Sequence, residues 1–373
     1  MSTERLENLA RAMIVEAGVA PSAVLTVGGR GTSGWHFRTG AAGIGSGERP
    51  ARVDPETPFD LASVTKPIVA STVARLVRRG VLEWKTPLSA LLPELRDTAT
   101  GPVSLELLLA HRAGLDAHRT LYAPLLEGRA VDPEAMIVEA ARARRTDCVG
   151  TPPDEGFPPL YSDLGYLLAG AAAARAAGQP LDQLIAVETS EPLGIDVRSA
   201  RHWERERASF RADVAPTEVV PWRGGEVAGE VHDENAWAFS GRGAAGHAGL
   251  FGTAESVARF GAAFLDALAG RHSGWLTPAE AKVLTRPRPL GTLRAGFDGK
   301  SAEGSSAGSA FSERSFGHLG FTGTSVWCDP DADLVAVILT NRVNPSRENI
   351  AIRAVRPRLH DALFGIGSEL SRL

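Results

Sequence analysis

The chain contains little cysteine. Its 373 residues include two cysteines, Cys148 and Cys328, which are too few for the disulfide framework of a small secreted domain. No spacing of cysteine and histidine resembles a zinc site. We therefore expect two free thiols, no metal and no cofactor.

The sequence also lacks the features of nucleic-acid-binding and membrane proteins. Its net charge is −4 and its pI is about 6.2, so no basic field points to a nucleic acid. No apolar run approaches the length of a membrane span. The N-terminal MSTERLENLARAMIVEAGV carries acidic residues where a secretory signal has a basic start and an apolar core. We expect a cytoplasmic protein, and the sequence leaves its oligomeric state open.

The chain is long enough for two domains, and 43% of its residues are apolar. Residues 23–29 and 35–38 predict a hairpin, and SVWCDP and LVAVILT predict a second strand pair near the C-terminus. Helical patterns cover residues 3–19 and dominate residues 80–245. We predict an α/β (α+β) fold in which an antiparallel sheet, flanked by helices, is formed by residues 1–79 and 246–373. An all-helical domain over residues 80–245 is inserted, and the active site lies between the two.

Lysine is scarce as well: four lysines stand among 40 basic residues, and only Lys66 has a serine, Ser63, three positions before it. Residues i and i+3 lie on one face of a helix, so the hydroxyl and the amine can touch. A serine becomes a nucleophile when a base takes its proton, and a buried lysine can be that base. Apolar residues follow at helical intervals up to Gly80, which indicates a half-buried face. The pattern places Ser63 at a helix N-terminus, where developing negative charge is stabilised.

Two further segments stand where a serine–lysine hydrolase needs them. The first is Tyr161-Ser162-Asp163, which follows the stiff loop GTPPDEGFPP and opens a helix. The second runs from His318 through Leu319, Gly320 and Phe321 into the strand SVWCDP. Together with Ser63 and Lys66, these ordered motifs resemble those of the penicillin-recognising serine hydrolases, the class C β-lactamase and D-alanyl-D-alanine carboxypeptidase type with its esterase relatives. The resemblance covers about residues 20–365.

The resemblance implies a β-lactamase/transpeptidase-like, penicillin-binding-protein-like fold and assigns roles to residues. Ser63 would be the acylated nucleophile, Lys66 its base or proton shuttle, and Tyr161 the second acid/base. The backbone N–H groups of Ser63 and Phe321 would form the oxyanion hole. Asp163 and the segment His318, Leu319 and Gly320 would contact the substrate.

The sequence departs from the family pattern at three of these positions. Asp163 stands where the β-lactamases usually have asparagine, and its carboxylate would raise the pKa of Lys66. We therefore hypothesise that Tyr161 is the general base, with a pKa lowered by the Lys66 ammonium. His318 replaces a permanent charge by a group that titrates near neutrality, and Leu319 replaces a threonine hydroxyl. These losses weaken the recognition of a substrate carboxylate and predict poor turnover of penicillins.

We predict a serine hydrolase that cleaves a small-molecule ester, amide or peptide bond through an acyl-enzyme on Ser63, with esterase-like preference. The alternatives are a D-alanyl-D-alanine carboxypeptidase, a β-lactamase, and a non-catalytic binding module that kept the fold. Asp163 is also a candidate N-cap of its helix. His111 and His247 are interpreted as structural, and residues 299–311 as a mobile loop whose closure over the site stays open.

Overall fold

The computed structural model describes residues 2–44, 53–271 and 274–373. Its main element is a six-stranded antiparallel sheet with the strand order β2-β1-β11-β10-β9-β8. Both chain ends build this sheet, since its first two strands come from the N-terminal hairpin and the others follow residue 297. The strands are β1 (Ser22–Gly31), β2 (Gly34–Gly43), β8 (Asp298–Gly299), β9 (Phe316–Leu319), β10 (Ser325–Asp329) and β11 (Leu334–Thr340).

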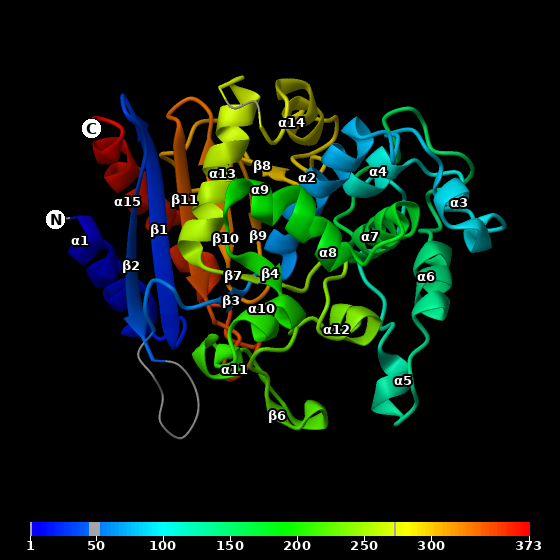
Figure 1. Cartoon of the computed structure of the whole chain (residues 1–373), viewed down its shortest axis with the longest axis horizontal. Helices are drawn as coiled ribbons and strands as arrows, with labels where there is room; N and C mark the ends of the chain where they lie inside the picture. Colours follow the sequence, from blue (N-terminus) through cyan, green and yellow to red (C-terminus); the bar gives the residue numbers. More distant parts are fainter. Residues whose placement is uncertain (1, 45–52, 272–273) are drawn as a thin grey trace.

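Helices cover both faces of the sheet (Figure 1). The helices α1 (Ser2–Ala10) and α15 (Ile352–Leu370) lie on one face, and α13 (Ala254–Leu268) lies on the other. The β11 sequence explains the two layers, because successive strand residues point to opposite faces. Leu334, Ala336 and Ile338 pack toward α1 and α15, whereas Val335, Val337 and Leu339 join the larger core.

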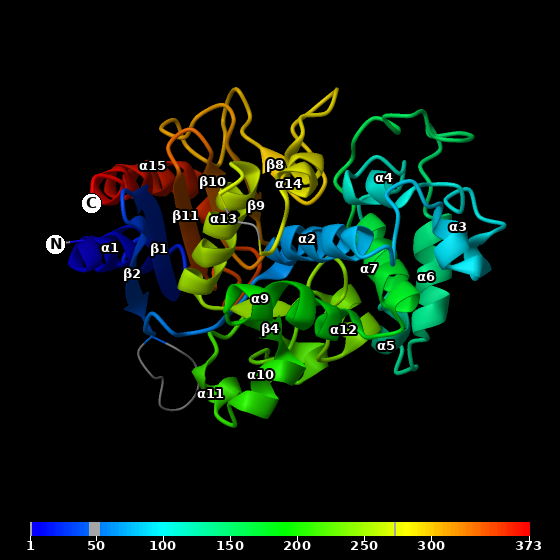
Figure 2. The same ribbon diagram turned by 45° about the horizontal axis from the view of Figure 1, so that its top comes forward.

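The rest of the molecule is mainly helical and lies beyond α13 (Figure 2). The helix α2 (Thr65–Arg78) extends from the sheet side into this part and packs against α7 and α14. The remaining helices are α3 (Leu88–Leu91), α4 (Leu105–Leu109), α5 (Ala123–Leu126), α6 (Pro133–Arg142), α7 (Asp163–Ala177), α8 (Leu181–Ile185), α9 (Glu191–Leu193), α10 (Ala200–Glu206), α11 (Phe210–Asp213), α12 (Glu234–Ser240) and α14 (Pro278–Thr285).

Short strands and turns complete the fold. A three-stranded sheet joins β3 (Phe59–Asp60), β7 (Leu250–Gly252) and β4 (Val197–Ser199), and β5 (Val219–Val220) pairs with β6 (Gly225–Glu226). Residues 80–245 thus contain three short strands besides their helices. Tighter or wider helical turns occur at η1 (Arg11–Val15), η2 (Ala62–Val64), η3 (Pro93–Leu95), η4 (Ala186–Ser190) and η5 (Pro221–Arg223).

The expected antiparallel sheet and its flanking helices are confirmed. The predicted hairpin forms β1 and β2, and the predicted C-terminal pair forms β10 and β11. The N-terminal helix is shorter than expected, since α1 gives way to the π-helical turn η1 at residue 11. In the described part of the chain no helix is both long and apolar enough to cross a bilayer.

Residues 299–311 pack onto the sheet side of the molecule. Phe311 is buried against α15, and Asp361 on that helix accepts hydrogen bonds from Ser309 and Ala310. The segment contributes no residue to the wall of the cleft described below. It is therefore fastened to α15 and does not cover the site in this structure.

Candidate active site

Ser63 lies in the turn η2, directly before α2. The preceding residue, Ala62, has a φ of 47°, a left-handed conformation that is uncommon for a residue other than glycine. The Asp60 carboxylate holds this turn, because it accepts hydrogen bonds from the backbone N–H groups of Ala62 at 2.8 Å and His232 at 2.8 Å. A strained turn fixed in this way points the Ser63 side chain out of the helix start and into the adjacent cleft.

Lys66 is one helical turn further on, and its side chain is completely buried. Its Nζ donates hydrogen bonds to Ser63 Oγ at 2.7 Å, to Asp163 Oδ1 at 2.7 Å and to the His247 carbonyl at 3.1 Å. All three donor positions of an ammonium group are thus used. The predicted contact between Ser63 and Lys66 is present.

The electrostatics keep Lys66 charged. Burial disfavours the ammonium form, but the Asp163 carboxylate and the Tyr161 oxygen outweigh it and raise the pKa of Lys66 above its ordinary value. Burial would also raise the pKa of Asp163, yet Lys66 and His118 hold it well below its usual range. In the resting site, Lys66 and Asp163 therefore form an ion pair.

Tyr161 reaches the same site from the end of the proline loop. The Lys66 Nζ lies 4.8 Å from the centre of its ring. Burial raises the pKa of Tyr161 above its ordinary value, although contacts with Lys66 and Ser63 act in the opposite direction. The Lys66 ammonium acts to lower the pKa of this phenol, as hypothesised, but burial has the larger effect and keeps that pKa above its ordinary value. The physical reason is that partial burial of the phenol disfavours the phenolate by more than the ammonium stabilises it. That Tyr161 is the general base stays a prediction.

His111 positions Tyr161. Its ring stacks on the Tyr161 ring with centres 4.7 Å apart, and its Nδ1 accepts a hydrogen bond from the Ser162 N–H at 3.0 Å. Burial, and after it the Lys66 charge, lowers the pKa of His111 to about 3. A neutral His111 is thus a fixed support for the turn that presents Tyr161, in line with its structural interpretation.

The helix α7 begins differently from the sequence expectation. Ser162 is the N-cap, since its side chain accepts a hydrogen bond from the Gly165 N–H. Asp163 is the first residue of the helix, so its interpretation as the N-cap is wrong. Because Ser162 satisfies the helix start, the Asp163 carboxylate remains available to Lys66.

His247 and His118 bring further contacts that the sequence did not indicate. His247 contributes its carbonyl to Lys66, while its ring Nε2 lies 3.0 Å from Asp233 Oδ1. His118 Nδ1 lies 3.9 Å from Asp163 Oδ2, and the Asp163 contact raises the pKa of His118. Neither histidine stands in a sequence motif with its partner, so only the folded arrangement reveals these pairs.

The strand β9 and the loop after it form the opposite wall. Two threonines fasten this loop to the start of the nucleophile turn: Thr322 Oγ1 donates to the Asp60 carbonyl at 2.8 Å, and Thr324 Oγ1 donates to the Leu61 carbonyl at 2.9 Å. Gly320 is required here, since a Cβ would come within 2.0 Å of Thr324 Oγ1. Phe321 directly precedes Thr322, so these hydrogen bonds hold it near the nucleophile turn.

His318 lies on β9 with its ring buried, 5.9 Å from the Tyr161 ring. Burial, with a smaller effect of the Lys66 charge, lowers the pKa of His318 to about 3. A neutral imidazole therefore stands where the family pattern has a cation. Its neighbour Leu319 offers an apolar side chain to the cleft.

A cleft of about 490 Å³ brings these groups together. Ser63, Tyr161, Asp163, Leu319 and Phe321 all line it. Of the predicted site residues, Lys66 and His318 lie behind this wall. Further lining residues come from parts of the chain that carried no motif: Tyr122, His232, Asp233, Glu234, Arg342, Arg347, Ile350, Ile352, Arg353 and Arg356.

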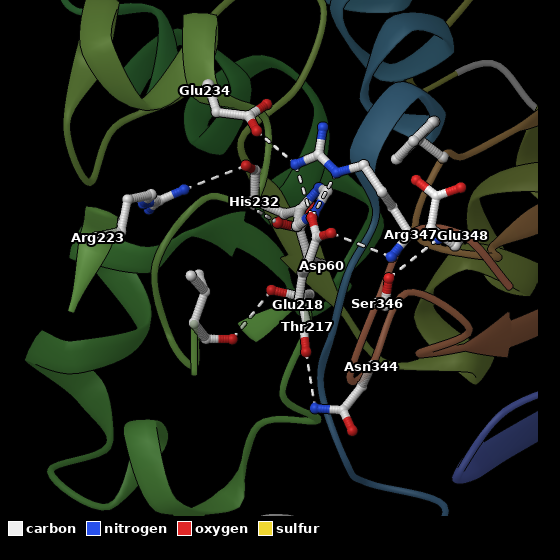
Figure 3. A network of polar contacts seen from close by, with 12 residues as sticks. Asp60, Thr217, Glu218, Arg223, His232, Glu234, Asn344, Ser346, Arg347 and Glu348 are labelled. Carbon is white, nitrogen blue, oxygen red and sulfur yellow. Dashed lines mark hydrogen bonds and ion pairs between the residues drawn. The ribbon is translucent and has the colours of Figure 1, made fainter. Parts of the chain in front are cut away.

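Several of these lining residues belong to a connected polar network (Figure 3). Glu218 accepts hydrogen bonds from His232 Nε2 at 3.0 Å and from the backbone N–H of Arg347 at 3.0 Å. The Arg347 guanidinium also contacts Glu218 at 2.6 Å and pairs with Glu234. This network joins the segment after β11 to the nucleophile turn through His232 and Asp60.

The described residues contain no group of three or more His, Cys, Asp or Glu side chains placed to hold a metal ion. Cys148 and Cys328 are buried free thiols, as expected. The arrangement instead offers a hydroxyl, an ammonium–carboxylate pair and a phenol within one pocket. These are the groups of acyl-transfer chemistry.

The chain is similar in sequence to curated bacterial proteins. The chain is 29% identical over 314 residues to an N-acetylmuramyl-L-alanine amidase of Bacillus subtilis (strain 168), with 79% of this chain and 70% of the relative covered. It is 26% identical over 321 residues to a putative D-alanyl-D-alanine carboxypeptidase of Escherichia coli (strain K12), with 79% and 71% covered.

A solved structure shows the same fold. EstCE1, a hydrolase with promiscuous acyltransferase activity, superposes with a TM-score of 0.70 at 21% identity over 97% of this chain and 98% of its own. The family model described as Beta-lactamase matches residues 10–359. The protein is therefore a member of the Beta-lactamase family of hydrolases.

Proposed function

We propose that the protein is a serine hydrolase that cleaves a carboxylic ester through an acyl-enzyme on Ser63. One observation carries the proposal: a fully buried lysine donates a hydrogen bond of 2.7 Å to a serine hydroxyl that lines the cleft. A structural lysine has no need of a serine hydroxyl at a pocket wall.

In the proposed reaction, Ser63 Oγ attacks the substrate carbonyl and its proton passes to the Lys66–Tyr161 pair. Both groups are protonated at rest, so the reactive form is the one in which the pair has lost one proton. Because the two groups interact closely, that proton belongs to the pair rather than to either residue. The pair then returns a proton to the leaving alcohol, and water releases the acid in a second step.

The oxyanion would bind to the backbone N–H groups of Ser63 and Phe321. Both residues line the cleft, and the two threonine hydrogen bonds keep their segments together. Donors fixed before the reaction stabilise the tetrahedral intermediate without reorganisation, and loss of one such donor costs about 10²- to 10³-fold in rate.

The esterase preference rests on His318 and Leu319. A neutral imidazole and an apolar side chain replace a lysine and a threonine on the strand beside the nucleophile. The names of the curated relatives favour the second candidate, cleavage of an amide or peptide bond, as in an amidase or a D-alanyl-D-alanine carboxypeptidase. An activated ester, p-nitrophenyl butyrate, and the peptide acetyl-Lys-D-Ala-D-Ala distinguish the two candidates.

The test measures kcat/KM on both compounds for the wild type and for Ser63→Ala, with Ser89→Ala on α3 as the control. We expect ester hydrolysis that disappears in Ser63→Ala and persists in the control. Release of D-alanine as fast as the ester is cleaved would replace the esterase by the carboxypeptidase. Ester hydrolysis that survives Ser63→Ala would overturn the proposed mechanism.

A further inference from the structure

Four arginines line one side of the cleft. Arg342 and Arg347 follow β11, and Arg353 and Arg356 stand in the first turns of α15. The substrate-facing strand β9, in contrast, offers a neutral His318 and Leu319. The positive charge of the cleft wall therefore lies on α15 and on the segment that precedes it.

The carboxylates near these arginines form ion pairs with Arg347. Its guanidinium contacts Glu218 at 2.6 Å and Glu234, while Glu218 also accepts from His232 (Figure 3). The pKa of Glu218 falls to about 2: burial opposes this, but its contacts with His232 and Arg347 prevail. The charge of Arg347 is thus balanced within the protein.

The other three arginines have no such partner. Within residues 2–44, 53–271 and 274–373, no carboxylate lies within 4 Å of the guanidinium of Arg342, Arg353 or Arg356. Arg342 donates instead to the carbonyls of Phe321 at 2.8 Å, Arg347 at 2.8 Å and Asn349 at 2.9 Å. Carbonyls orient a guanidinium but do not neutralise it.

Arg356 is the most unusual of the three. Only 6% of its surface is exposed, its Nε is buried without a hydrogen-bond partner, and its Nη2 donates over a long 3.4 Å to the Thr324 carbonyl. Burial, and after it the charges of Arg342 and Arg353, lowers the pKa of Arg356 to about 10. A buried guanidinium that faces two other cations and has unused donors is costly unless an anion completes the site.

We propose that Arg353 and Arg356 bind a carboxylate carried by the substrate, so that the enzyme acts on an anionic ester. A guanidinium presents donors in a planar fork that matches a carboxylate, and Arg342, which lines the same cleft, adds positive charge. This inference rests on the proposed function and specifies its substrate class. It also moves carboxylate recognition from β9, where Leu319 has no hydroxyl, to the start of α15.

The test uses two pairs of esters, because the carboxylate can lie on either side of the scissile bond. One pair is mono-p-nitrophenyl glutarate and p-nitrophenyl valerate, with the charge on the acyl side. The other is m-carboxyphenyl phenylacetate and phenyl phenylacetate, with the charge on the leaving group. The readout is the ratio of kcat/KM for the charged ester to that for its neutral partner.

We expect the wild type to favour the charged member of at least one pair. Arg353→Met and Arg356→Met should each lower that ratio by roughly tenfold or more, the effect of one charge-assisted hydrogen bond, with little change on the neutral ester. Arg358→Met is the matched control, because Arg358 is an exposed arginine of the same helix, and it should leave the ratio unchanged. Arg353 is exposed, so its variant should fold even if Arg356→Met does not.

An unchanged ratio in Arg353→Met for both pairs would overturn the inference while leaving the serine hydrolase intact. If no ester is hydrolysed, the proposed function fails, and calorimetric titration of Ser63→Ala protein with glutarate still tests the site. In that titration we expect glutarate to bind, and we expect the further change Arg353→Met to weaken the binding. Equal heats of glutarate binding with and without Arg353→Met would refute the carboxylate site. Inhibition by inorganic phosphate as strong as that by glutarate would contradict the carboxylate assignment.

Discussion

Replacing Asp163 by asparagine should move the pH dependence of acylation toward lower pH. Asp163 Oδ1 lies 2.7 Å from Lys66 Nζ, whose side chain is fully buried. This carboxylate is the main group that keeps Lys66 charged against the cost of burial. Without it, burial is opposed mainly by the Tyr161 oxygen, so the pKa of Lys66 falls.

The size of the shift follows from the geometry. Two unit charges 2.7 Å apart attract by about 6 kcal/mol at an effective dielectric constant of 20, which is a ceiling because both groups lose solvation. A carboxylate at this distance typically shifts the pKa of its partner by about 1 to 3 units, or about 1.4 to 4 kcal/mol. We expect the midpoint of the pH profile to fall by that amount in Asp163→Asn.

The sign is fixed by which form reacts. The pKa values of Lys66 and Tyr161 are both raised, so in the wild type the pair loses its proton only at alkaline pH, and acylation should rise with pH above neutrality. In Asp163→Asn the same proton leaves at lower pH, so acylation should begin its rise earlier. The high-pH plateau should be lower, because a weaker base removes the Ser63 proton less effectively.

The assay is the pre-steady-state burst of p-nitrophenol from p-nitrophenyl butyrate between pH 5 and 10.5. Asp97→Asn, a change of an exposed aspartate far from any site motif, should leave the profile where it is. A profile of Asp163→Asn that coincides with that of the wild type would refute the reasoning, since the carboxylate would then not control the reacting proton.

Three further predictions concern single contacts. Tyr161→Phe should lower the acylation rate, measured by the same burst, by about 10²- to 10⁴-fold, which is the range for loss of an acid/base group. An acylation rate near that of the wild type, together with an inactive Lys66→Ala, would remove Tyr161 from the proposed pair. Gly320→Ala should destabilise the protein by about 1–3 kcal/mol, because the new Cβ meets Thr324 Oγ1 and the Leu61 carbonyl. An unchanged midpoint of denaturation in urea would show that the loop after β9 is not packed this closely against Leu61. Benzylpenicillin should be hydrolysed much more slowly than p-nitrophenyl butyrate, because the strand beside the nucleophile, β9, offers its carboxylate the neutral His318 and Leu319, and the proposed carboxylate site lies apart from β9, at the start of α15. Rapid loss of the absorbance of benzylpenicillin at 232 nm would contradict the esterase preference.

Elements that depend on local sequence could be predicted. The β1–β2 hairpin and the β10–β11 pair both follow from short apolar segments separated by turn residues. The contact between Ser63 and Lys66 is equally local, because spacing of three on a helical segment brings the two side chains together. The division into domains at residues 79 and 245 stays a prediction.

Features that depend on long-range packing could not be predicted. The π-helical turn η1 interrupts a regular helical pattern where Ile14 is buried against the sheet. An aspartate just before an apolar helical pattern is typical of a helix cap, and only the hydrogen bond from the Gly165 N–H to Ser162 shows that Ser162 is the cap instead of Asp163. Because Ser162 is the cap and Asp163 is the first residue of the helix, the Asp163 carboxylate is available to pair with Lys66.

The same limit applies to the cleft wall. The pairing of Arg347 with Glu218 joins residues 129 positions apart, and the meeting of His118 with Asp163 depends on how the loops pack. No periodicity or motif links such residues. That Arg353 and Arg356 have no carboxylate partner among the described residues can be known only from the folded structure.

The most direct test of the account is intact-protein mass spectrometry after incubation with a fluorophosphonate. We expect the wild type and the control Ser89→Ala to gain one phosphonyl group, and Ser63→Ala to gain none. Labelling of Ser63→Ala to the same extent as the wild type, or no labelling of any of the three proteins, would contradict the claim that Ser63 is an activated nucleophile.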